Sequence, residues 1–157
     1  MKIKGKKITG VNVEVIPIPR GNGADIILKA RAVMDTAPFD KMCPIPTPPL
    51  RKIDGVDVPQ LKDRNYLTQV TRHSERRLAW LIITSLEATE GLEWEMVKAD
   101  DPSSWIRVRE ELKAAGFNAV EVQRIIATVI GVNSLSEVKI EAARERFLLS
   151  EQVQEDE

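Results

Sequence analysis

Leu78-Ala79-Trp80-Leu81-Ile82-Ile83-Thr84-Ser85-Leu86 is among the most apolar stretches of this 157-residue chain. It lies in a longer segment, Asp63 to about Ala88, whose charged side chains leave one broad face free. That face carries Leu67, Val70, Leu78, Leu81, Ile82 and Leu86. The spacing predicts one long amphipathic helix, and Gly91 ends it or follows its end closely.

Three further helices are expected toward the C-terminus. Asp101-Pro102 is typical of an N-cap followed by proline at the first helical position, and Gly116 supplies the stop. The face of this helix carries Trp105, Val108 and Leu112. Asn118, with Glu121 three residues on and a Phe117–Val122 staple, begins the next. Its inner face is Val122, Ile125, Ile126, Val129 and Ile130. Ser134-Leu135-Ser136-Glu137 is a capping box for the last helix, which carries Val138, Ala142 and Phe147.

The pattern of the first sixty residues predicts strands and loops. Val11, Val13 and Val15 alternate with polar residues, which predicts a strand with one buried face that Pro17 and Pro19 close. Gly21-Asn22-Gly23 predicts a hairpin turn into a second strand within 24–34. The buried face of that strand is expected to be Ile26, Leu28, Ala30 and Ala32. Lys2 to Ile8 is expected to add an edge strand.

A proline-rich connection follows the second strand. Residues 44–49 hold four prolines and predict an extended, polyproline-like segment. Asp54-Gly55 then predicts a small hairpin over 52–58.

Composition places a boundary near residue 62. Eight of the nine prolines lie before it, and six of the seven aromatic residues after it. Residues 1–62 carry 11 Lys/Arg against 6 Asp/Glu, and residues 63–157 carry 12 against 18. We therefore predict an α+β fold. A β-rich, basic, proline-rich segment (1–62) with a hairpin and an extended arm precedes a four-helix bundle (63–150) and an acidic tail (151–157).

The overall composition excludes several classes of protein. A hydrophobic fraction of 43% and a charged fraction of 30% are ordinary for a soluble globular protein and exclude disorder throughout. The apolar runs are too short for a membrane span, and no secretion signal is visible. One cysteine permits no internal disulfide, so a reducing cytoplasm is expected.

The residues that could carry chemistry are few. His73 is the only histidine and lies among charged residues, so we expect a solvated side chain rather than a metal ligand. Cys43 has no neighbouring base, and we expect an inert thiol. Gly21-Asn22-Gly23 lacks the rest of a phosphate loop. Six carboxylates crowd residues 87–101 without the spacing of a calcium loop. We expect no catalytic, cofactor or metal site and no enzymatic activity.

Nucleic-acid binding has more support than catalysis, though we do not expect it. Lysines at positions 2, 4, 6 and 7 form a basic arm, and Arg72, Arg76 and Arg77 form a basic stripe on the long helix. The chain is nevertheless net acidic, and no aromatic residues interleave the arm. A solvated edge strand and an outer helix face account for both clusters.

Several segments of the C-terminal part carry a family resemblance. They are Arg77–Ala88, Gly91-Leu92-Glu93-Trp94-Glu95, Asp100–Trp105, Glu111–Phe117, Asn133-Ser134-Leu135 and Ala143–Leu148. Together, over residues 63–149, they resemble the tail assembly chaperones of tailed bacteriophages. The shared features report a fold and include no reaction signature.

The resemblance implies a role in tail morphogenesis in the host cytoplasm. Such proteins bind the long tape-measure protein, recruit tail-tube subunits, and are absent from the finished virion. Many have a longer form made by frameshifting near the end of the gene, a junction that the acidic tail 151–157 would suit. A small structural tail protein and a nucleic-acid-binding regulator are the alternatives.

Contact with a partner would use apolar residues of the strands and the tryptophans. The expected ones are Trp94, Trp105, Val13, Val15, Ile26 and Leu28. For the tryptophans, packing against each other is the plainer expectation. The β-rich segment is poorly equipped to bury a core alone, so its strands are expected to complete their packing on the helices, on a second copy in a homo-oligomer, or on a partner chain.

Overall fold

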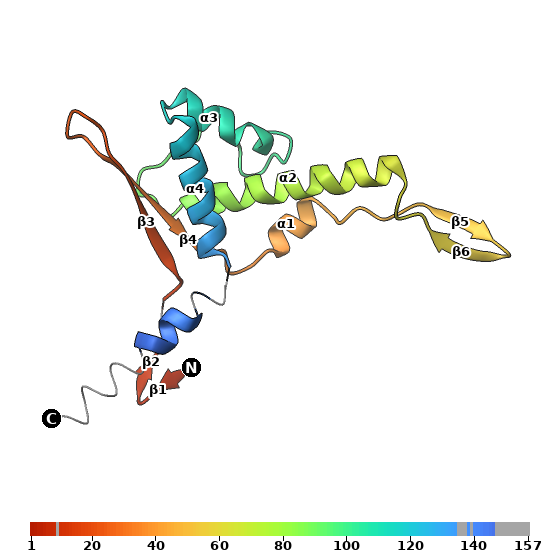
Figure 1. Ribbon diagram of the computed structural model, residues 1–157, viewed down its shortest axis with the longest axis horizontal. Coiled ribbons are helices and arrows are strands. Elements are labelled where there is room, and N and C mark those ends of the chain that lie inside the picture. The colour runs from red at the N-terminus through yellow and green to blue at the C-terminus, as the bar shows by residue number, and fades with distance from the viewer. Residues whose placement is uncertain (9, 135–137, 139, 147–157) are drawn as a thin grey trace.

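The computed structural model describes residues 1–8, 10–134, 138 and 140–146. It has a mixed α+β fold of small antiparallel hairpins and helices, which confirms the predicted class (Figure 1). The strands are β1 (Lys2–Ile3), β2 (Lys6–Lys7), β3 (Val13–Ile18), β4 (Ile26–Arg31), β5 (Leu50–Ile53) and β6 (Val56–Pro59). The helices are α1 (Ala37–Met42), α2 (Arg64–Leu86), the 3₁₀ turn η1 (Trp105–Arg107), α3 (Val108–Ala114) and α4 (Ala119–Val132).

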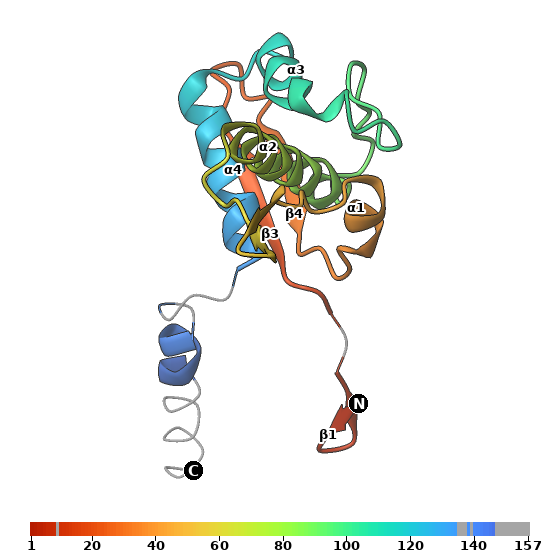
Figure 2. The same ribbon diagram turned by 90° about the vertical axis from the view of Figure 1, so that its right-hand side faces the viewer.

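Helix α2 is the centre of the fold. The Asp63 side chain accepts a hydrogen bond from the Tyr66 backbone N–H and caps its start, as predicted. Its N-terminal half is mostly exposed, whereas its last turns are buried on nearly every side. Figure 2, which looks along this helix, shows α3, α4, α1 and the β3–β4 hairpin arranged around it. A helix end that is apolar all round requires such a complete enclosure.

The β3–β4 hairpin supplies one wall of the core. Ile16 and Ile18 of β3 and Leu28 and Ala30 of β4 are buried against α2 and α4. The expected face of β4 is therefore confirmed. That of β3 is wrong, because Val13 and Val15 point outward and the opposite parity is buried.

The prolines of β3 also behave differently from expectation. Pro17 lies inside the strand, opposite Ile27, rather than closing it. A proline without an N–H is tolerated in a strand when that position faces an open edge. The predicted turn at residues 21–23 is confirmed, since β3 and β4 pair antiparallel across it.

Two smaller hairpins stand apart from the core. The prediction of an edge strand at Lys2–Ile8 is wrong, because β1 pairs only with β2 through a turn at Lys4-Gly5. β5 and β6 form the predicted second hairpin, and Asp54 and Gly55 both have positive φ, as a two-residue turn of this kind requires. In Figure 1 the β5–β6 hairpin projects beyond the N-terminal end of α2.

Helix α1 was not predicted from the sequence patterns, and it contributes a buried side chain to the core. Its Phe39 is fully buried, with ring centroids 5.5 Å from Trp80 and 6.1 Å from Trp105. Trp80 and Trp105 therefore both pack against Phe39, and the expected packing of the tryptophans against each other is not confirmed. His73 packs edge-on against the same ring and lies 3.1 Å from the Cys43 carbonyl, so the prediction of a solvated histidine is wrong.

The third helical segment begins later than predicted. The Asp101 side chain accepts hydrogen bonds from the backbone N–H and hydroxyl of Ser103, which closes a turn instead of starting a helix. The chain becomes helical only at Trp105. The predicted stop is confirmed, because Gly116 has a φ of 92° and the Phe117 N–H reaches back to the Leu112 carbonyl.

The predicted cap of α4 is confirmed. Asn118 accepts from the N–H groups of Val120 and Glu121, and the Glu121 carboxylate accepts from the Asn118 N–H. Four of the five expected inner residues are buried, while Ile130 is exposed and Val132 is buried instead.

The four-helix bundle and the extended proline-rich arm are not confirmed. Helices α2, α3 and α4 share their core with the β3–β4 hairpin, and residues 44–49 form neither helix nor strand. Residues 138 and 140–146 are helical but lie away from that core (Figure 1). The predicted capping box at 134–137, Phe147 and the acidic tail 151–157 fall wholly or mainly outside the described residues. The boundary near residue 62 stays a prediction.

A buried carboxylate fixes the connection between α2 and α3. Glu111 is 8% exposed and accepts hydrogen bonds from three successive backbone N–H groups, those of Glu95, Met96 and Val97. Charge-assisted bonds of this kind are stronger than neutral ones. The connection is held further by the Trp105 indole N–H, which donates to the Lys98 carbonyl at 2.9 Å.

Removing this carboxylate should destabilise the protein. We expect Glu111→Ala to lower the free energy of unfolding by about 3 kcal/mol, because three backbone N–H donors lose a charged acceptor, and Glu111→Gln by about half as much. Urea unfolding followed by tryptophan fluorescence measures both. Glu110→Gln is the matched control, since this neighbouring carboxylate is exposed and should change stability by less than about 0.5 kcal/mol. Equal effects at the two positions would contradict the assignment.

Candidate partner-binding surfaces

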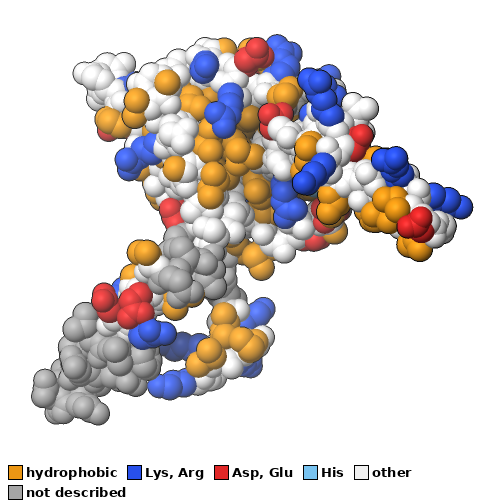
Figure 3. Space-filling model, turned by 45° about the vertical axis from the view of Figure 1, so that its right-hand side comes forward, with side chains coloured by type: hydrophobic (Ala, Val, Ile, Leu, Met, Phe, Trp, Pro, Cys, Tyr) orange, Lys and Arg blue, Asp and Glu red, His pale blue; other side chains and the backbone are white. Residues whose placement is uncertain are grey.

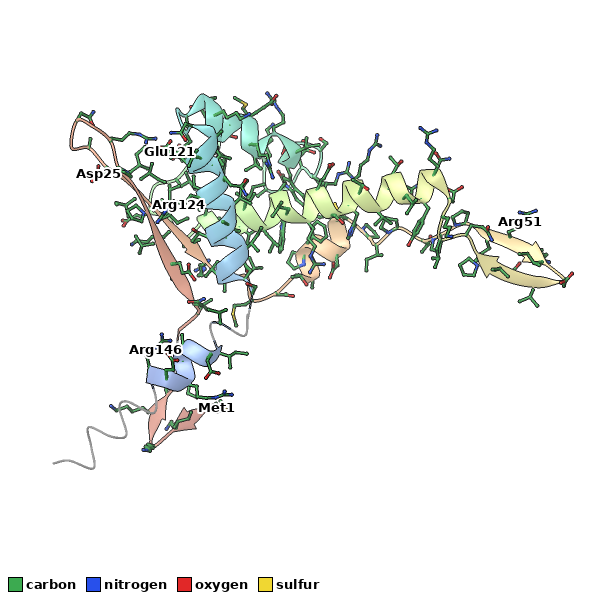
Figure 4. All side chains as sticks on the ribbon, in the orientation of Figure 1. Met1, Asp25, Arg51, Glu121, Arg124 and Arg146 are labelled. Carbon is green, nitrogen blue, oxygen red and sulfur yellow. The ribbon has the colours of Figure 1, made fainter. Side chains whose placement is uncertain are left out.

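The β3–β4 hairpin is locked to the helices from two sides. Arg20, just after β3, forms an ion pair with Glu121 at the start of α4, and its guanidinium lies 5.4 Å from the Phe117 ring centroid. Figure 4 shows Glu121 next to the hairpin loop that holds Asp25. At the other end, the Val33 N–H donates to the Asn133 side chain at 2.7 Å. The hairpin is therefore a fixed part of the body.

The outer face of this hairpin is the first candidate surface. It carries the exposed apolar side chains of Val13, Val15 and Ile27, and Val15 is 57% exposed. Lys29 and Arg31 lie opposite the two valines and give the same face a basic margin. An apolar strip with a charged margin suits contact with another protein.

The two edges of the hairpin differ. On β4, the Lys29 N–H donates to the Thr89 hydroxyl at 2.8 Å, and that hydroxyl donates to the Lys29 carbonyl at 3.1 Å. The Thr89 side chain thus occupies the β4 edge where a further strand would pair. β3 forms the other edge, and among the described strands it pairs only with β4.

A groove between α2 and the η1–α3 segment is the second candidate surface. Its volume is about 240 Å³. It is lined by Glu75, Leu78, Ala79, Ile82, Ile106, Val108 and Arg109. Ile106 is 63% exposed, so an apolar side chain stands open to solvent at the groove. Figure 3 shows hydrophobic side chains gathered on the helical body and on the projecting β5–β6 hairpin.

Of the six residues predicted to contact a partner, two are exposed, two are half-buried and two lie in the core. Val13 and Val15 are exposed on the hairpin, and Ile26 is half-buried. Leu28 and Trp105 lie inside the core, so neither meets a partner in this fold. Trp94 is half-buried, and its indole N–H is enclosed without an acceptor among the described residues.

Sequence patterns did not identify the groove, although one signal was present. Ile106 directly follows Trp105 and lies off the stripe formed by Trp105, Val108 and Leu112. An apolar residue that breaks the helical period points away from the core when its neighbours point into it.

No constellation for chemistry appears in the part of the chain that the structure describes. Its His, Cys, Asp and Glu residues form no group that could hold a metal ion. Cys43 is buried. Within the same residues, no helix is both long enough and apolar enough to cross a bilayer.

Comparison of the chain with protein-family models, with curated proteins and with solved structures finds no match in any of the three. The resemblance to tail assembly chaperones therefore stays a prediction carried by the sequence segments quoted above.

The ion pair between Arg20 and Glu121, which holds the β3–β4 hairpin to α4, should be sensitive to acid. The pKa of Glu121 lies below its ordinary value, first because the Arg20 side chain donates to this carboxylate and then because the Asn118 backbone N–H does. A group whose pKa is lowered by folding stabilises the protein above its unfolded pKa, and this contribution is lost as pH falls through the folded value. We expect the wild type to be more stable than Glu121→Gln at neutral pH, with a difference that shrinks below pH of about 4.5 and then vanishes.

Chemical denaturation across an acid series measures this difference. In an Arg20→Ala background the main cause of the lowered pKa is gone, so the effect of Glu121→Gln should be smaller at every pH. A difference that grows toward low pH would contradict the assignment.

Proposed function

We propose that this chain is a non-enzymatic chaperone of phage tail assembly that holds a helical segment of the tape-measure protein. The observation that carries the proposal is the open apolar groove between α2 and the η1–α3 segment. The sequence resemblance over residues 63–149 supplies the partner. The proposed place of action is the host cytoplasm before the virion is complete.

The groove has the features of a receptor for an amphipathic helix. Leu78 and Ile82 lie one turn apart on α2, and Ile106 faces solvent beside them. Glu75 and Arg109 add charges of opposite sign to the lining. Helices dock in such grooves by placing an apolar stripe along the floor and polar residues against the margin. A long, largely helical tape-measure protein offers many segments of this kind.

The proposed role needs contact rather than covalent chemistry. A chaperone shields apolar surface until assembly covers it, and modest grooves on a rigid body are sufficient for reversible binding. The closed core around α2 provides that rigidity, because the groove floor is formed by the same helix that the core encloses. Recruitment of tail-tube subunits completes the proposed role.

A charge introduced at the groove should weaken capture of the tape-measure protein. We expect Ile106→Glu to weaken co-purification with the co-expressed tape-measure protein by about tenfold or more, because a carboxylate would replace a central apolar contact. Val120→Glu is the matched control, since Val120 is 79% exposed on α4, outside the groove. Equal capture by the wild type and Ile106→Glu would contradict the groove assignment. No capture by the wild type would contradict the proposed function.

Mass spectrometry of purified particles separates the chaperone from the alternative of a structural tail protein. We expect the chain to be present in infected-cell lysates and absent from purified virions. A fixed copy number in the virion would favour the structural alternative.

A further inference from the structure

A basic cleft lies between the N-terminal half of α2 and the chain that follows α1. Its volume is about 250 Å³, and α2 contributes Gln69, Arg72, His73 and Arg76 to its lining, with Cys43 on the opposite wall. Arg72 and Arg76 are exposed, and neither has a hydrogen-bond or ion-pair partner among the described residues. Two such guanidinium groups in one cleft are suited to bind an anionic group.

The walls of this cleft are fixed by contacts with the core. Cys43 is buried, its N–H donates to the Phe39 carbonyl at 2.8 Å, and its own carbonyl lies 3.1 Å from His73 Nε2. The neighbouring Arg77 already has a contact within the chain, because its guanidinium lies 5.9 Å from the Phe39 ring centroid. The cleft is therefore formed before any partner binds, which lowers the entropic cost of binding.

The spacing of the two arginines selects a particular kind of anion. Residues four apart on a helix have Cβ atoms about 5–6 Å apart. In an extended chain, residues two apart lie on the same side and are separated by about 6.6 Å. A short extended segment with carboxylates at alternate positions therefore matches Arg72 and Arg76 one to one. Arginine and carboxylate groups form strong, charge-assisted hydrogen bonds in such pairs.

The chain itself contains such a segment in the connection between α2 and η1. Among the described residues, Glu93 and Glu95 are the only two carboxylate side chains separated by one residue. Both are exposed, and neither carboxylate has a hydrogen-bond or ion-pair partner in the described part of the chain. Trp94 between them packs against the core, and Glu111 accepts from the Glu95 backbone N–H. The segment is therefore held in place with its two carboxylates open to solvent.

We propose that Glu93-Trp94-Glu95 of one copy docks in the basic cleft of a second copy, where its two carboxylates pair with Arg72 and Arg76. The contact joins two surfaces of opposite charge that both belong to this chain. It shares no residue with the lining of the groove between α2 and the η1–α3 segment. This self-association therefore does not depend on the proposed tape-measure role.

The two surfaces cannot meet within one chain. Glu93 lines the same small cavity as Leu86, which is the last residue of α2. Arg76 lies ten residues before Leu86 in this helix. That separation corresponds to about 15 Å along the helix axis, too far for an ion pair.

The charge of the cleft favours a short acidic segment over a nucleic acid. Gln69 also lines a second hollow, of about 340 Å³, that continues along α2 toward its start. The lining of that hollow includes the Asp63 carboxylate and, among the described residues, no lysine or arginine. A nucleic acid running along the helix would bring phosphate charges to this carboxylate, since every nucleotide carries one. Two carboxylates need only the end that holds Arg72 and Arg76.

Reversing the charges tests the contact on the full-length chain. Sedimentation velocity over a concentration series should show that the wild type self-associates, and does so less at high salt, because screening weakens ion pairs. Arg72→Glu/Arg76→Glu and Glu93→Arg/Glu95→Arg should each raise the concentration needed for association about tenfold or more, because each brings like charges together. An equal mixture of these two variants should associate like the wild type, since opposite charges face each other again. The variant with all four changes should do the same.

Lys113→Glu/Arg124→Glu is the matched control. It changes the net charge by the same amount as Arg72→Glu/Arg76→Glu, but both residues are exposed on α3 and α4, outside the cleft (Figure 4 labels Arg124). This control should associate like the wild type, and circular dichroism should confirm that all variants fold. A wild type that stays monomeric at every attainable concentration would overturn the proposal. So would a Glu93→Arg/Glu95→Arg variant that associates like the wild type, a control as impaired as the cleft variant, or a mixture that fails to recover.

Discussion

The fold depends on enclosing the C-terminal half of α2, which is apolar on nearly every side. Trp80, Ile82, Ile83 and Leu86 point in different directions around this half, and each is buried. One layer of helices covers only part of such a surface, so the β3–β4 hairpin and α1 become structural requirements. The one buried polar residue of this half, Ser85, has its hydroxyl satisfied by the Asn133 amide at 2.9 Å. Because Asn133 also accepts from Val33, it ties α2, α4 and the hairpin end together.

This enclosure separates the two proposed contact surfaces. The groove lies between α2 and the η1–α3 segment, whereas the exposed apolar strip lies on the outer face of the β3–β4 hairpin. A partner bound to the outer face of the hairpin would leave Ile106 free to meet a helical partner. The two activities can therefore fail independently when residues of one surface are changed.

Local signals in the sequence were sufficient for caps and turns, because these depend on neighbouring residues. Asn118 with Glu121, the stop at Gly116 and the turn at Asp54-Gly55 all occur where predicted. The buried face of β3 was mistaken for a different reason. One side of this strand carries the apolar residues Val13 and Val15, and the other side carries Ile16 and Ile18. Which side is buried therefore depends on which one meets α4.

The candidate sites were harder to predict because they depend on packing between distant segments. Trp105 was predicted to contact a partner, but Phe39 of α1 packs against its ring and the Lys98 carbonyl accepts a hydrogen bond from its indole N–H. Ile106 is exposed for the same reason, since its neighbour takes the buried position. The uncovered β3 edge follows from pairing directions that no single strand reveals.

The core contains no residue between Cys43 and Ala79. The stretch from 44 to 62 therefore connects two parts of the chain that pack against each other without its help. Because doubling the length of a flexible connection costs only about 0.6 kcal/mol, insertions outside its β5–β6 hairpin should leave the stability of the enclosed helix nearly unchanged.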